Sequence, residues 1–203
     1  FSSTTVSMAD YHVEEYVREM NLAAVKLARD LADEYTAKNP DKPRFVAGSV
    51  GPTNKTCSMS PDVNNPAYRA LSYDELAASY QQQMEAMLEG GVDAILIETI
   101  FDTLNAKAAI FAAEQAMKMT GIEVPIMLSV TVSDIGGRTL SGQTLDAFLA
   151  SVQHANIFSV GLNCSFGARQ LKPFLEQLAS RAPYYISAYP NAGLPNSLGK
   201  YDQ

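Results

Sequence analysis

The chain has 203 residues, 47% of them hydrophobic and 18% charged, and a formal net charge of -7. This composition excludes a disordered or collagen-like chain and predicts one domain with a buried core, while the excess of acidic groups argues against nucleic acid as a partner. The longest run of aliphatic and Phe residues, 108–113, is far shorter than the roughly 18 residues of a membrane span, so we expect a cytoplasmic protein with no membrane partner.

The chain begins with an amphipathic pattern that predicts a helix. Apolar residues recur every three or four positions from Ala9 to about Lys38, and Asn39-Pro40 ends the pattern. The apolar run 44–50 is too short for a helix and is closed by Gly51-Pro52. This run therefore predicts the first strand.

The same order of helix and strand repeats four more times. Ser72 and Glu75 have the spacing of a capping box, and Asp102 can cap the next helix. Pro173 lies in the last helical pattern, so that helix either begins near Lys172 or is kinked. The predicted helices cover 72–91, 102–121, 145–152 and about 171–178, and the predicted strands are 93–98, 125–132, 157–163 and 184–189.

Helix–strand pairs at a spacing of roughly 30 residues predict an α/β fold with a parallel sheet, either doubly wound or a barrel. No Gly-x-Gly-x-x-Gly follows a strand and no Gly-Lys-Ser/Thr occurs, which favours the barrel. A complete (β/α)8 TIM barrel needs about 250 residues, so five of eight strands would make an incomplete one. Because the chain starts at Phe1 without Met and stops just after an apparent turn, we expect a domain truncated at both ends.

The loops that leave the C-terminal ends of parallel strands usually build the functional site. The loop 51–71 is long and polar, as expected of a lid or binding loop, although a plain surface loop is the alternative. Glu98 ends an apolar strand, where a carboxylate is costly to bury without a cationic partner. That partner is either a bound ammonium group or a distant arginine such as Arg138, unless the carboxylate reaches solvent.

Cys164 ends another strand just before a helix, where the helix dipole favours the thiolate form that binds metals or attacks electrophiles. An inert buried cysteine is the alternative, and one thiolate cannot hold zinc alone. The other soft donors are weaker candidates: Cys57 as a thiol of the long loop, and His12 and His154 as helix-surface residues. Two cysteines are too few for a disulfide framework, so we expect both thiols reduced.

The last strand runs into a turn-rich segment, 189–196. Its backbone amides are suited to positioning a polar ligand, and the alternative is an ordinary turn. Together with five other stretches it resembles the homocysteine-binding barrel of cobalamin-dependent methionine synthase. The long loop resembles that enzyme more than the stand-alone or betaine-dependent homocysteine methyltransferases, which share the barrel and the zinc. The matching stretches are VAGSVGPTNKT, SPDVNNPAYR, ILIETIFDTLNAKAAI, GGRTLSGQT, GLNCSFG and YPNAGLPN, in the family's order.

The resemblance implies a zinc ion held by three cysteine thiolates, with the homocysteine sulfur as fourth ligand. Cys164 matches the first cysteine, and the other two follow a strand that lies beyond this chain. The strand-end Glu98 is expected to bind the substrate amino group. Asn163 is expected to hydrogen-bond the Cys164 loop or its sulfur, and with Asn191 it completes the expected substrate-binding residues.

The resemblance also implies the reaction and its partners. Homocysteine sulfur would take the methyl group of methylcobalamin to give methionine, and cobalamin-binding and folate-binding modules would lie elsewhere in the same polypeptide. Residues 1–203 would then be part of a single homocysteine-binding barrel domain. The alternatives are a corrin-independent homocysteine S-methyltransferase and an inactive fragment that lacks two zinc ligands.

Overall fold

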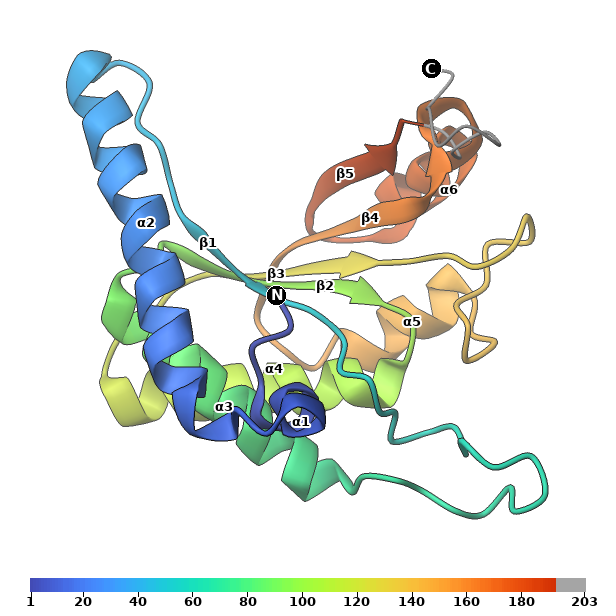
Figure 1. Cartoon of the computed structure of the whole chain (residues 1–203). Helices are drawn as coiled ribbons and strands as arrows, with labels where there is room; N and C mark the ends of the chain where they lie inside the picture. The colour runs from blue at the N-terminus through green and yellow to red at the C-terminus, as the bar shows by residue number, and fades with distance from the viewer. Residues whose placement is uncertain (193–203) are drawn as a thin grey trace, which may run out of the picture.

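The five predicted strands are present and pair in chain order. The computed structural model describes residues 1–192, and its sheet is parallel throughout, with the order β1-β2-β3-β4-β5 (Figure 1). A doubly wound sheet would reverse this order at a switch point, whereas a barrel adds each strand beside the previous one. The strands are β1 (Ala47–Val50), β2 (Ala94–Ile100), β3 (Ile126–Val130), β4 (Ile157–Gly167) and β5 (Tyr185–Asn191).

The helices support the same architecture. Along the chain, each helix from α2 to α6 packs against the next, and Figure 1 shows α3, α4 and α5 along one side of the sheet while β4 and β5 curve away on the other. The fold is therefore an α/β barrel of five strands that is not closed. None of the helices described is long and apolar enough to cross a membrane. They are α2 (Val17–Lys38), α3 (Tyr73–Gly90), α4 (Thr103–Thr120), α5 (Leu145–Val152) and α6 (Ala168–Arg181).

The predicted helix ends of α3 and α4 are confirmed. Ser72 and Glu75 form both hydrogen bonds of the capping box at the start of α3, and Asp102 accepts hydrogen bonds from the first turn of α4. Gly91 and Gly121 follow the two helices with φ angles of 92° and 70°, a left-handed conformation that glycine adopts without steric cost. Local chemistry therefore sets these four boundaries.

The first helix is shorter than predicted. Instead of one helix from Ala9, the structure has the short helix α1 (Thr5–Met8), two 3-10 turns and then α2 from Val17. His12 interrupts the pattern because it adopts a left-handed conformation with φ 56°. The apolar period continues through this break, so periodicity alone could not reveal it.

Two further boundaries differ from the prediction. Helix α6 begins at Ala168, so Pro173 lies in its second turn and not in its first. Strand β4 continues four residues past Asn163, to Gly167. The polar end of this strand pairs with β5, and it was expected to be a loop because its residues are not apolar.

The core lies between the sheet and its helices. Apolar residues of every other strand position face the helices and are fully buried, among them Val50, Leu128 and Val160. The opposite face is more polar and carries Ser49, Glu98 and Ser129. Strand β5 is an edge strand whose residues are mostly exposed, so the sheet formed by residues 1–192 has open edges at β1 and β5.

Candidate functional site

The Glu98 side chain lies toward the C-terminal end of β2 and is half-buried. Its carboxylate accepts a hydrogen bond from the Ser49 hydroxyl of the neighbouring strand β1. Within residues 1–192 no ion pair includes Glu98, and Arg138 instead donates to the carbonyl of Gly142. The structural pairing with Arg138 is therefore wrong, and the Glu98 side chain is partly exposed to solvent.

The Asn163 side chain is the centre of a hydrogen-bond network at the ends of β2, β3 and β4. It is 3% exposed, and its Oδ1 accepts from the Thr99 backbone N–H at 3.1 Å and from the Ser129 hydroxyl at 2.7 Å. Its Nδ2 donates to Thr99 Oγ1 at 2.9 Å and to Cys164 Sγ at 3.1 Å. The buried Asn163 amide therefore makes all four of the hydrogen bonds that it can form, and it connects the ends of β2, β3 and β4.

The backbone at these strand ends is strained. Thr99, Cys164 and Ser165 have φ angles of 59°, 58° and 63°, a region that residues with a Cβ rarely occupy, and Thr99 is also β-branched. The pairing of β2 with β3 shifts register between Ile97 and Ile100, so Glu98 and Thr99 form an irregularity at the strand end. Irregularities of this kind change the direction of a side chain and cluster at functional sites.

Cys164 has the surroundings expected of a functional thiol. It is half-buried and free, its sulfur accepts the Asn163 amide, and α6 begins four residues later. However, no group of three or more His, Cys, Asp or Glu residues in the part of the chain described is placed to hold a metal. Cys164 is thus suited to be one ligand of a zinc ion, but these residues alone do not complete the site.

The remaining expected site residue, Asn191, is the last residue of β5 and pairs with Gly167 of β4. The strand register places Cys164 opposite Pro190, one residue before Asn191. Glu98, Asn163, Cys164 and Asn191 thus all lie toward the C-terminal ends of parallel strands, on β2, β4 and β5. The rest of the turn-rich segment, 193–196, lies outside the described residues.

The long loop 51–71 is held by buried polar side chains of α4. Asp102, 2% exposed, accepts hydrogen bonds from the backbone and hydroxyl of Ser58, and Asn105, 4% exposed, accepts from the Cys57 N–H and donates to the Lys55 carbonyl. The sequence identified Asp102 only as a helix cap. The spacing of Asp102 and Asn105 within one helical turn is a signal for this second role, but it does not say which loop they hold.

The other soft donors lie away from the site. Cys57 is 7% exposed and packs in the core, and burial raises the pKa of its thiol, which disfavours the thiolate. His12 and His154 are exposed. Ser49, Thr99 and Ser129 could not be predicted as site residues, because a single hydroxyl residue in a strand forms no recognisable sequence motif.

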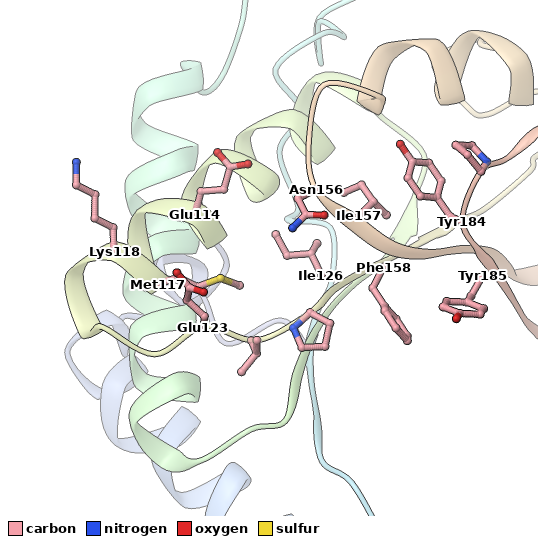
Figure 2. Close-up of a pocket in the computed structure, with 13 residues that line it drawn as sticks. Glu114, Met117, Lys118, Glu123, Ile126, Asn156, Ile157, Phe158, Tyr184 and Tyr185 are labelled. Atoms are coloured by element: carbon pink, nitrogen blue, oxygen red, sulfur yellow. The ribbon is translucent and has the colours of Figure 1, made fainter.

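A wide cleft at the opposite end of the strands is not this site. It is lined by residues at the starts of β3, β4 and β5, including Ile126, Ile157 and Tyr185, and by the C-terminal part of α4 (Figure 2). Phe158 packs against Tyr185 there, with ring centroids 5.0 Å apart. In parallel α/β folds, chemistry is built at the C-terminal strand ends, whereas this end contributes mainly to stability.

A parallel α/β barrel with polar side chains at the C-terminal strand ends is the arrangement typical of barrel enzymes. The sequence profile of the homocysteine S-methyltransferase family matches residues 1–203, so the chain belongs to that family.

Three solved structures of the homocysteine methyltransferase MmuM from Escherichia coli have the same fold. The metallated form matches with a TM-score of 0.76 at 21% identity, over 95% of this chain and 65% of MmuM. The oxidised form gives 0.75 at 22%, over 94% and 63%, and the apo form 0.69 at 23%, over 87% and 61%. This chain therefore spans less than two thirds of the length of these relatives.

Proposed function

We propose that this chain is the homocysteine-binding part of a methyltransferase that methylates the homocysteine sulfur to give methionine. The observation that carries the proposal is the placement of Glu98 and Cys164 on the ends of β2 and β4, joined through the Asn163 amide. The carboxylate of Glu98 can pair with the ammonium group of an amino-acid substrate, and the thiol of Cys164 can ligate a metal that binds the substrate sulfur. Membership of the homocysteine S-methyltransferase family supports the same reaction.

Glu98 would bind the substrate ammonium. Ser49 donates a hydrogen bond to one carboxylate oxygen, which fixes the carboxylate and leaves the other oxygen for a ligand. A hydrogen bond between two charged groups is about twice as strong as one between neutral groups, so this contact would supply orientation as well as affinity. Asn191, at the end of β5, is proposed as a further substrate-binding residue.

Cys164 would supply one thiolate ligand to zinc, and Asn163 would orient its sulfur through the amide hydrogen bond. The two remaining protein ligands would come from polypeptide outside these 203 residues, in a longer protein that we call the complete enzyme. Bound zinc supplies one property, a homocysteine sulfur held as thiolate at neutral pH. Residues 1–203 would then be part of one barrel domain, inactive by itself.

The methyl donor is proposed to be methylcobalamin, presented by a separate module of the complete enzyme together with a folate-binding module. The support is the long loop 51–71, whose sequence resembles the cobalamin-dependent enzymes. The likeness to the homocysteine methyltransferase MmuM is compatible with either donor, so a corrin-independent homocysteine S-methyltransferase is the second candidate. Assaying the complete enzyme with methylcobalamin as the only methyl donor separates the two, because a corrin-independent enzyme would not form methionine from it.

The central test is Glu98→Gln in the complete enzyme. The substitution keeps the shape of the side chain but removes the charge, so homocysteine binding should weaken by about ten- to a hundredfold, equivalent to about 1.5–3 kcal/mol. Zinc content should not change, since Glu98 is not proposed as a ligand. Calorimetric titration with homocysteine measures the first effect and metal analysis the second.

The control ligand is 2-mercaptoethanol, a thiol without an amino group. Its binding should be nearly the same in the wild type and the Glu98→Gln variant. If both thiols are weakened equally, Glu98 has a structural role and the proposed ammonium contact is wrong.

A further inference from the structure

Asn163 connects the two halves of the proposed site, and this connection goes beyond orienting the cysteine. Its Oδ1 accepts the Thr99 N–H and its Nδ2 donates to Thr99 Oγ1, so the amide forms two hydrogen bonds with the residue directly after Glu98. The same Nδ2 donates to the Cys164 sulfur. The Asn163 amide therefore links the end of β2, which carries Glu98, to the thiol of Cys164.

The strained backbone of Thr99 requires these hydrogen bonds. A β-branched residue at φ 59° persists only where surrounding contacts hold it, at a cost of about 1–3 kcal/mol. The contacts that hold it come from Asn163, which Ser129 in turn fixes from β3 at 2.7 Å. If the pair of hydrogen bonds were lost, the end of β2 could relax toward a regular strand, and the Glu98 side chain would change direction.

We infer that the Thr99–Asn163 pair sets the distance between the ammonium-binding and sulfur-binding points, and so selects the length of the substrate side chain. The inference rests on the proposed function. Homocysteine and cysteine carry the same two groups but differ by one methylene between them. A rigid site accepts only one of these lengths, and a difference of one methylene is worth roughly 10- to 200-fold in discrimination. Thr99 and Asn163 are therefore positioning residues that determine specificity.

The test is Thr99→Val in the complete enzyme. Valine keeps the β-branched shape and the backbone strain but removes the oxygen that accepts the Asn163 amide, and it leaves the side chains of Glu98 and Cys164 in place. The expected result is a preference for homocysteine over cysteine that falls about tenfold. This result should come from weaker homocysteine binding, with cysteine binding unchanged or stronger and zinc content unchanged. The readout is calorimetric binding of both amino acids, with no methyl donor present.

The matched control is Thr131→Val. Thr131 donates to the Asn163 backbone carbonyl at 3.3 Å, so it makes the same kind of bond nearby without touching the Asn163 amide. This variant should keep the wild-type preference. A second variant, Asn163→Leu, is similar in size and removes both the acceptor of the Thr99 N–H and the donor to Thr99 Oγ1, so it should reproduce the loss of preference.

The outcomes separate the inference from the proposed function. Unchanged preference in Thr99→Val, or equal weakening of both amino acids, overturns the inference while the proposed function stands. A wild-type enzyme that binds neither amino acid overturns the proposed function itself. If Thr131→Val loses the preference as Thr99→Val does, the effect belongs to the strand ends in general and the specific role of the amide is wrong.

Discussion

At the scale of single residues, the two cysteines show how surroundings decide chemistry. Cys57 lies in the core at 7% exposure, where burial raises the pKa of its thiol, whereas Cys164 is half-buried at a strand end with an amide donor on its sulfur. The sequence distinguished them only by position, since Cys164 ends an apolar strand. The resemblance alone led us to expect that Asn163 hydrogen-bonds the Cys164 loop or its sulfur, and the structure has this bond to the sulfur.

We predict that Cys164→Ser in the complete enzyme lowers zinc content to a small fraction of stoichiometric, while Cys57→Ser leaves it nearly unchanged. A neutral hydroxyl lacks the charge and softness of a thiolate ligand, and Cys57 is proposed to have no metal to hold. Metal analysis of the two purified variants, each checked by circular dichroism, measures the effect. Stoichiometric zinc in Cys164→Ser would refute the assignment of this ligand.

At the scale of elements, patterns in the sequence predicted what local chemistry determines. The five strands, and the ends of α3 and α4, follow from apolar runs, capping residues and glycines. The predicted start of the first long helix was wrong, because no sequence pattern indicated that His12 adopts a left-handed conformation. Hydrogen bonds between distant elements, such as Ser49 to Glu98 across 49 residues, could not be predicted, because they depend on which strands become neighbours.

The attachment of the long loop to α4 gives a prediction for Asp102→Ala. This change removes the cap of α4, worth about 1 kcal/mol, and both hydrogen bonds that hold Ser58. Trypsin should therefore cleave faster after Lys55 and Arg69, which lie in the loop. The control is Asp134→Ala, which removes an exposed carboxylate that binds backbone amides of another loop. Equally faster cleavage after Lys118 in α4 would indicate general unfolding and contradict a local effect.

At the scale of the whole molecule, the open barrel leaves apolar and hydrogen-bonding surface without partners. Among residues 1–192, β1 and β5 each have one unpaired edge, and Tyr185 and Tyr189 of β5 are 72% and 51% exposed. On α2, Leu27, Leu31 and Tyr35 follow one another at intervals of four residues and are 69%, 57% and 52% exposed. A helix carries apolar residues on the face that it buries, so this row indicates a second face of α2 suited to packing.

We therefore predict that residues 1–203 alone are marginally stable and self-associate. Free strand edges pair with other chains, and apolar surface of this extent favours association, so light scattering should show a mass that rises with protein concentration. Ile186→Lys, a charge on the exposed edge strand β5, should reduce the association, because a lysine at an edge disfavours pairing with another strand. The double substitution Leu27→Glu and Leu31→Glu should reduce it if the α2 face contributes. A monomer that unfolds reversibly in one sharp thermal transition would show that five strands suffice for a stable fold.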